Sequence, residues 1–451
     1  MRITHWQMTP VEETVEVSAE VDGFRLWYRV PGSYAISRTG DPFLTAALLP
    51  AMARGEPLEI DSSLTVSPRL LTHVALLQEI HHCWNPALQK IPIVARTAPS
   101  EPSNAGTFSF FSGGVDGTYT VLKRAREITY VVFLYGFDFY VDANTYQAAV
   151  ERNRTFVHGL GKILIPVQTN HYRFNYHHNL SRLLTQGSAL ASVALLLGFP
   201  RAYVSSSWAY DQLFPSGSHP LIDPLWSSEA VDLVHDGSEV HRLDKLRTIL
   251  GFPPALANLR VCAEDMNANC GHCEKCVRTM ITLHLLGVPG PFPPFPPLNI
   301  IRKRRVANDR EKIFLLENIA LARESGNHTL RKALLACLRR YELRQFLKGL
   351  DRALWGGLIR QTYRRRRIAR LGPPRIQTVA QEMDRPALPL NPSAHAGGPL
   401  PRSGALATDV RRAPSGPAAA ARKALTSDGD HRVHARPVTL PADPRTDWSR
   451  R

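Results

Sequence analysis

Long apolar runs are missing from this sequence of 451 residues, and none approaches the roughly 20 residues that a membrane helix needs. The segment after Met1 also lacks the apolar core of a secretory signal, so we expect a cytoplasmic protein with no membrane span. The phosphate-binding motif G-x-x-x-x-G-K-[ST] does not occur, which excludes that way of holding a nucleotide. The sequence gives no indication of the oligomeric state.

Cysteine is scarce as well, and four of the six cysteines are clustered with the spacing C-x7-C-x2-C-x2-C. These four are Cys262, Cys270, Cys273 and Cys276. Thiolates two residues apart can point at one ion from a turn, and Gly271 permits that turn. We therefore predict a four-cysteine metal knuckle that holds Zn²⁺, with an iron–sulfur cluster as the alternative. Cys83 and Cys337 are isolated, and we interpret them as structural.

The composition is that of a globular chain with a basic C-terminal part. Hydrophobic residues make up 44% of the sequence, and the net charge is +16. Much of that charge follows residue 298, where the run Arg364 to Arg367 could meet RNA, a membrane surface or an acidic partner, or be a solvated helix end. The predicted regions are 1–100 (a small α+β domain), 101–288 (an α/β domain), 289–298 (a proline-rich linker), 299–371 (basic helices) and 372–451 (a disordered tail).

The chain is organised around a glycine turn, residues 112–117, between a predicted strand at 107–111 and a predicted helix at 118–126. Adjacent glycines leave peptide N–H groups accessible, and a helix start favours phosphate. Asp116 would repel a bare phosphate, so we expect it to cap the helix or to bind Mg²⁺ carried by a nucleotide. The candidate nucleotide-binding residues of the turn are Ser112, Gly113, Gly114, Val115, Asp116, Gly117 and Thr118.

From residue 107 onward, predicted strands alternate with predicted helices, which indicates a parallel, doubly wound sheet. Ligands of such sheets bind beyond the carboxyl ends of the strands. Hydroxyl residues at 205–210 follow a predicted strand at 201–205. A loop region beyond them contains His219, Asp223 and His235, which could serve as acid, base or magnesium partner. Arg242 and Lys245 lie one helical turn apart, where they could neutralise a pyrophosphate or form a solvated helix face.

With its flanking strand and helix, the run Ser112-Gly-Gly-Val-Asp116 resembles the S-G-G-x-D-S/T loop of the PP-loop ATP pyrophosphatases. The knuckle that follows is similar to the zinc-binding cysteines of the 7-cyano-7-deazaguanine synthases in that superfamily. The resemblance covers about 105–287 and implies a HUP-like fold that binds adenine and ribose near Gly136 and Asp138, where a plain turn is the alternative. This chain has Gly117 where the family has Ser or Thr, and Thr118 could supply the hydroxyl from the next position.

The resemblance implies an enzyme that uses ATP and Mg²⁺ to adenylate a small-molecule carboxylate or carbonyl, releases pyrophosphate, and couples the product to a nitrogen or sulfur nucleophile. Two alternatives stay open. The first is an RNA-modifying enzyme that docks tRNA on its basic helices, and the second is a nucleotide-binding or scaffold protein in which Gly117 reflects lost catalysis.

Overall fold

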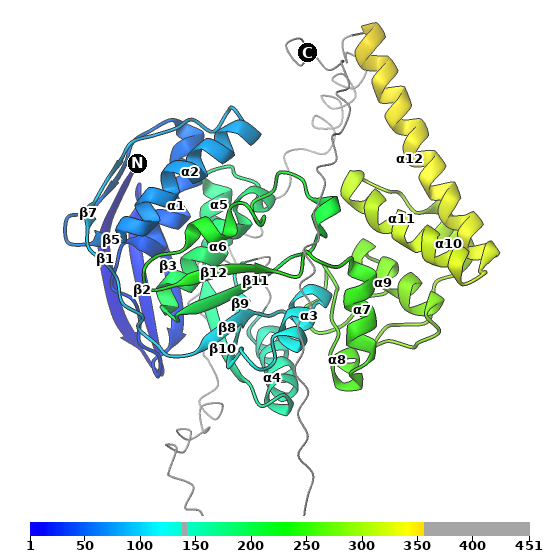
Figure 1. Ribbon diagram of the computed structural model, residues 1–451, viewed down its shortest axis with the longest axis horizontal. Helices are drawn as coiled ribbons and strands as arrows, with labels where there is room; N and C mark the ends of the chain where they lie inside the picture. The colour runs from blue at the N-terminus through cyan, green and yellow to red at the C-terminus, as the bar shows by residue number, and fades with distance from the viewer. Residues whose placement is uncertain (138–141, 356–451) are drawn as a thin grey trace, which may run out of the picture. The chain divides into compact units, whose positions relative to one another are not determined.

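The computed structural model describes residues 1–137 and 142–355 (Figure 1). The predictions made for Asp138, for Arg364 to Arg367 and for the tail therefore lie outside the described residues. Within these ranges, no helix is both long enough and apolar enough to pass through a bilayer.

Ten strands form one mixed sheet in the order β12-β11-β8-β9-β10-β3-β2-β1-β4-β6, and β5 pairs with β7 apart from it. The strands are β1 (Arg2–Val11), β2 (Thr14–Val21), β3 (Phe24–Pro31), β4 (Leu58–Ile60), β5 (Thr65–Val66), β6 (Ile93–Val94), β7 (Arg96–Thr97), β8 (Thr107–Phe110), β9 (Tyr130–Tyr135), β10 (Ile163–Thr169), β11 (Arg201–Ser205) and β12 (Asp232–Asp236).

The α-helices are α1 (Asp41–Arg54), α2 (Pro68–Trp84), α3 (Val115–Lys123), α4 (Ala143–Gly159), α5 (His171–His177), α6 (Arg182–Leu197), α7 (Arg242–Leu250), α8 (Pro253–Ala257), α9 (Glu274–Leu285), α10 (Leu298–Lys303), α11 (Asp309–Glu324) and α12 (His328–Trp355). Two short 3₁₀ helices are η1 (Tyr210–Gln212) and η2 (Asp223–Trp226).

The five strands from β8 to β12 are all parallel, and the parallel arrangement of the first four was predicted. Along the sheet they run β10-β9-β8-β11-β12, so the chain builds outward from β8 in one direction and then returns to add β11 on its other side. The strand order reverses between β8 and β11. In doubly wound sheets this is the place where ligands bind.

The N-terminal strands continue the same sheet, because β3 pairs antiparallel with β10. The pair Asp22-Gly23 between alternating segments at 11–21 and 24–30 predicts a hairpin. The structure confirms it as the turn between β2 and β3, with Asp22 at φ 53° and Gly23 at φ 81°. Positive φ values at both central residues of a two-residue turn suit the right-handed twist of the strands that it connects. The sheet thus runs across residue 100, where we predicted a domain boundary.

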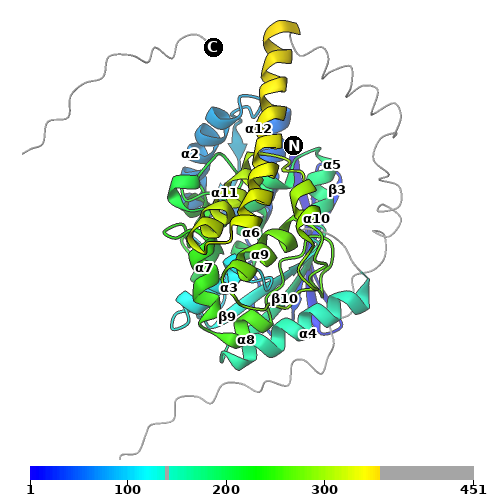
Figure 2. The same cartoon turned by 90° about the vertical axis from the view of Figure 1, so that its right-hand side faces the viewer.

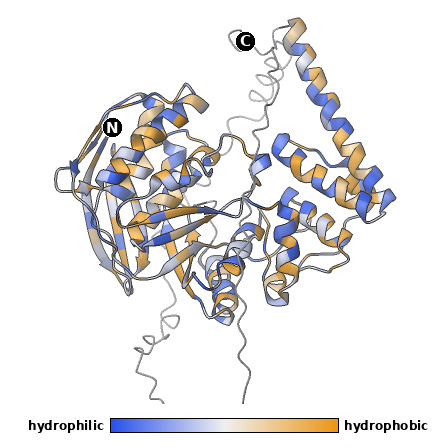
Figure 3. Ribbon diagram, viewed as in Figure 1, coloured by the Kyte–Doolittle hydropathy of each residue, from blue (hydrophilic) through white to orange (hydrophobic). Residues whose placement is uncertain are grey.

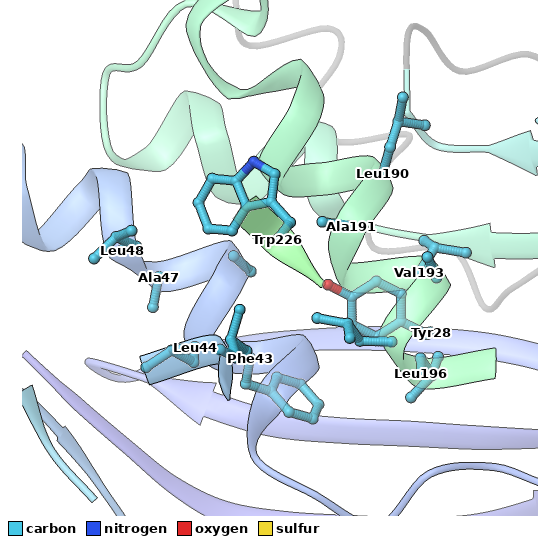
Figure 4. Close-up of a cluster of buried hydrophobic side chains, with 14 of the residues drawn as sticks. Tyr28, Phe43, Leu44, Ala47, Leu48, Leu190, Ala191, Val193, Leu196 and Trp226 are labelled. Carbon is cyan, nitrogen blue, oxygen red and sulfur yellow. The ribbon is translucent and has the colours of Figure 1, made fainter. Parts of the chain in front are cut away.

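One apolar core joins the two halves of the sheet. Tyr28 on β3 contacts Ser192 on α6 through its hydroxyl, and Phe43 on α1 packs edge-on against the Tyr28 ring. Figure 4 shows α1 and α6 contributing leucines and alanines to this core beside Trp226. The end of β10 and the C-terminal half of α6 are therefore fixed by packing on the N-terminal elements.

Several helix boundaries agree with the sequence. The sequence predicts a helix at 41–54, Ser67 as the cap of the next helix, and Gly198 as the stop of a later one. Helix α1 spans 41–54, the side chain of Ser67 caps α2 by accepting from the N–H of Leu70, and Gly198 ends α6 in the left-handed conformation. Two differences affect the site. Helix α3 begins at Val115 rather than at residue 118, and residues 232–236 form strand β12 rather than a loop.

The proline-rich segment before α10 has no regular structure, as predicted, and the helices that follow pack on α9. Thr282 on α9 donates to the side chain of Asn318 on α11 at 2.8 Å. Figure 2 shows α10, α11 and the first half of α12 close to α9. These C-terminal helices therefore bring side chains to the region that we predicted to bind the nucleotide.

Candidate functional site

A cavity of about 760 Å³ lies beyond the carboxyl ends of β8 and β11. Its walls come from the glycine turn, the hydroxyl segment after β11, the start of α7, the segment before the cysteine knuckle, α9 and α11. The basic side chains in its lining are Arg182, Arg242, Arg260, Lys275, Arg278 and Arg310, and the acidic ones are Asp116, Glu274 and Glu311. The excess of positive charge suits an anionic ligand.

The glycine turn forms one wall of the cavity. Gly113 has a φ of 77°, and its carbonyl accepts from the N–H of Arg260 at 2.8 Å. The first hydrogen bond of α3 runs from the N–H of Thr118 to the carbonyl of Gly114 at 3.0 Å. Within the described part of the chain, the backbone N–H groups of 112–117 donate to no protein acceptor. Such groups at a helix start suit phosphate oxygens.

Asp116 does not cap α3, and its carboxylate instead holds two cations from α7. Arg242 donates to both carboxylate oxygens at 3.1 and 3.0 Å, and the Nζ of Lys245 lies 3.8 Å from one of them. Ser207 adds a hydrogen bond of 3.0 Å. The structure thus brings together the three charged residues that we predicted for this site, although they are far apart in sequence.

Burial and neighbouring positive charge shift the pKa of Asp116 in opposite directions. Burial raises the pKa of the Asp116 carboxyl, but the charges of Arg242 and Lys245 outweigh it and hold that pKa below its ordinary value. Burial also lowers the pKa of Lys245, whose ammonium donates to the carbonyl of Ser206 at 2.6 Å. Both cations are therefore fixed in position next to the glycine turn.

The structure places three further residues of the predicted nucleotide site, Thr118, Gly117 and Gly136. Thr118 does not line the cavity, since its side chain is buried and its Oγ1 has no partner in the described chain. A Cβ at Gly117 would lie 3.3 Å from the carbonyl oxygen of Phe110, so close packing on the end of β8 favours glycine there. Gly136 ends β9 with a φ of 76°, and the adjacent Phe137 lines the cavity.

His235 and Asp223 form a second polar group at the cavity. His235 lies on β12, and its Nδ1 is 2.6 Å from Asp223 Oδ2, while its Nε2 is 3.1 Å from Ser238 Oγ. Asp223 is buried and also accepts from Ser218 at 2.7 Å. Burial, and then the proximity of His235, lowers the pKa of His219. Of these residues, His235 and His219 line the cavity, whereas Asp223 lies behind them.

The cysteine knuckle lies next to the same cavity, because Cys262 is part of the lining. All four sulfurs lie within 4.8 Å of one another, and the pairs Cys262–Cys273 and Cys270–Cys276 are 3.9 Å apart. Sulfurs bound to one Zn²⁺ in a tetrahedron lie about 3.8 Å apart. A four-iron cluster would spread them further, since each thiolate binds a different iron. The spacing therefore fits one metal ion such as zinc.

Backbone hydrogen bonds orient the thiolates of the knuckle. The sulfur of Cys262 accepts from the N–H groups of Glu264 and Asp265 at 3.3 and 3.2 Å, and that of Cys270 accepts from Cys273 at 3.2 Å. Burial raises the pKa of Cys262, but these and other hydrogen bonds outweigh it and bring that pKa down to about 7. Such support is typical of metal-binding thiolates.

Helix α11 supplies a wall of the cavity that the sequence did not indicate. Phe314 stacks on Trp208 at 4.9 Å between ring centroids, and the guanidinium of Arg278 lies 3.9 Å from the Phe314 centroid. Burial, and then repulsion by Arg242, lowers the pKa of Arg278 to about 10. The sequence leaves two interpretations for Lys275 and Arg278, a role facing phosphate or, by default, a place in solvent, and both residues line the cavity. An apolar residue on a helix beyond a proline-rich segment gives no sequence signal for this role.

Comparisons of the chain with family models, with curated proteins and with solved structures give no match.

Proposed function

We propose that the chain is an ATP-dependent enzyme of the PP-loop type, which adenylates a small carboxylate or carbonyl compound and releases pyrophosphate. The observation that carries the proposal is the glycine turn, which lies where the strand order reverses. Its backbone N–H groups donate to no acceptor in the described protein, and Arg242 and Lys245 lie next to the turn. A positively charged cavity of about 760 Å³ has room for a nucleotide and a small acceptor.

In the proposed reaction, the N–H groups of 114–117 bind the β- and γ-phosphates of ATP. An oxygen of the acceptor attacks the α-phosphorus, and the bond from that phosphorus to the oxygen bridging to the β-phosphate breaks. Negative charge then develops on the leaving pyrophosphate. Arg242, which lines the cavity and which Asp116 holds in place, would stabilise that charge without moving. Lys245 is buried behind the lining and would add its positive charge from there.

His235 is our candidate for the proton acceptor in the second step, in which a nitrogen or sulfur nucleophile displaces AMP. The carboxylate of Asp223 lies at its Nδ1 and would stabilise the imidazolium that forms. His219 would stay neutral near pH 7, because its pKa is lowered. Its Nδ1 accepts from the N–H of Leu221 at 3.1 Å, so its Nε2 carries the proton and would donate a hydrogen bond to an oxygen of the substrate.

The two proposed metals differ in how well the residues fit them. The four cysteines suit Zn²⁺, which would act as a structural link between the cavity wall at 260–263 and α9. At the glycine turn, the described residues offer magnesium no comparable site, because both oxygens of Asp116 already accept from Arg242. We therefore route no step through magnesium and expect it to enter with the nucleotide, bound mainly by phosphate oxygens.

A screen for pyrophosphate release from ATP tests the proposal. It would use metal-analysed full-length protein with panels of small acids, ammonia and sulfur donors, and with tRNA as a separate acceptor. Changing Arg242 to Ala should reduce release by about 10²–10³-fold, as for loss of one charge-stabilising donor. Arg247 to Ala is the control, because Arg247 lies on the same helix and pairs with Asp244 at the surface. ATP binding without release for any acceptor would favour the scaffold alternative, and absence of ATP binding would refute the proposal.

A further inference from the structure

The second half of α12 presents an exposed apolar stripe that none of the proposed chemistry uses. Five large apolar side chains there are between 36% and 64% exposed: Leu343, Phe346, Leu347, Leu350 and Leu354. Their spacing of three and four residues places them on one face of the helix. Figure 1 shows this half of α12 extending past α10 and α11, and Figure 3 shows apolar and polar residues alternating along it.

The opposite face of α12 accounts for the packing of this helix on the protein. Leu330, Leu334 and Tyr341 are buried, and the hydroxyl of Tyr341 donates to Asp309 on α11 at 2.6 Å. The stripe is therefore not needed to attach α12. Isolated exposed apolar residues are ordinary, but a contiguous row of them on one helix face indicates an interaction surface.

The charge of α12 identifies the kind of partner. The helix contains seven Lys or Arg residues and two Asp or Glu residues. Lys332 and Arg339 lie at helical spacing from Leu343, and they continue the stripe toward the body of the protein as an exposed basic segment. A partner with an apolar interior and a negatively charged surface would match both the apolar stripe and the basic segment.

We propose that this face of α12 binds an anionic lipid surface, with the stripe in the outer acyl region and Lys332 and Arg339 at the headgroups. Helices with an apolar face and basic residues lie in membrane interfaces in this way. A second copy of the chain fits less well, because two such basic helices would repel each other and the stripe is short for a coiled coil. The inference is independent of the proposed adenylation.

Co-sedimentation of the full-length protein with lipid vesicles tests this inference. We expect binding to vesicles of phosphatidylcholine with phosphatidylglycerol, little binding to pure phosphatidylcholine, and weakening by salt. The double change Leu347→Ser and Leu354→Ser should reduce the bound fraction by about tenfold or more, because it removes apolar contact area. Since both side chains are exposed, the thermal unfolding of this variant should match that of the wild type.

A matched control changes two apolar residues of similar exposure elsewhere, Leu76→Ser and Val94→Ser, which are 50% and 59% exposed in the wild type. This control should bind vesicles as the wild type does. The changes Lys332→Gln and Arg339→Gln should abolish the preference for anionic vesicles. Equal binding by both leucine and control variants, or no binding by the wild type, would overturn the proposal. So would a dimer in light scattering that dissociates in the Leu347→Ser and Leu354→Ser variant while vesicle binding persists.

Discussion

Changing Asp116 to Asn should destabilise the protein, because it removes the counter-ion of two buried cations. The side chain of Asp116 is 19% exposed, and those of Arg242 and Lys245 are 8% and 1% exposed. Removing one partner of a buried ion pair typically costs about 3–5 kcal/mol. We expect about 2–4 kcal/mol here, since Asp116 retains some solvent and Asn can still accept one hydrogen bond from Arg242.

Urea unfolding followed by circular dichroism measures this difference. The control is Asp244 to Asn on α7, whose partner Arg247 lies 2.9 Å away with both side chains about half exposed. That change should alter the free energy of unfolding by no more than about 0.5 kcal/mol. If Asp116 to Asn had an equally small effect, the charge cluster would not be as the structure describes it, and the positioning role of Asp116 would be refuted.

The pH dependence of the free energy of unfolding gives a second comparison between the wild type and the Asp116 to Asn variant. The folded-state pKa of Asp116 is lowered from an ordinary value of 3.8, because the cations outweigh burial. A carboxyl of this kind contributes stability above its unfolded-state pKa, and the contribution is lost as the pH falls through the folded-state pKa. The difference between wild type and Asp116 to Asn should therefore stay constant from about pH 5 to pH 8 and decrease below about pH 4.

Three further predictions follow from the site. Gly113 to Ala should abolish ATP binding measured by calorimetry, because the added Cβ would lie 3.1 Å from the side-chain oxygen of Asn153 on α4. Gly161 to Ala, which has a similar φ but nothing within 4 Å of the added Cβ, should bind ATP normally. Elemental analysis should find one zinc per chain, lost on changing Cys276 to Ser but kept on changing the exposed Cys83 to Ser. His235 to Gln should leave pyrophosphate release intact but slow product formation by about 10²–10⁴-fold, and equal slowing of both steps would contradict its assignment.

The local signals in the sequence predicted local structure well. The Asp22-Gly23 turn, the Ser67 cap and the strand at residues 201–205 depend on a few adjacent residues, and each is confirmed. The parallel order followed from the alternation of strands and helices. The spacing of the cysteines likewise predicted the knuckle, because a tight turn alone brings three of the four thiolates together.

What the sequence could not supply was the set of contacts between distant segments. Asp116 and Arg242 were both candidates, but residue spacing cannot show that they pair across 126 positions. Strand β12 was missed because the segment 232–236 is short and has an aspartate at each end, a pattern that is typical of a loop. Phe314 reaches the cavity only through the packing of α11 on α9, a tertiary effect without a local pattern.

The most direct test of the account is a crystal structure of the protein with a non-hydrolysable ATP analogue and Mg²⁺. We predict the terminal phosphates within hydrogen-bonding distance of the N–H groups of 114–117, with the guanidinium of Arg242 alongside them. An analogue bound elsewhere in the cavity, or a glycine turn that stays free of phosphate at saturating analogue, would contradict the central claim.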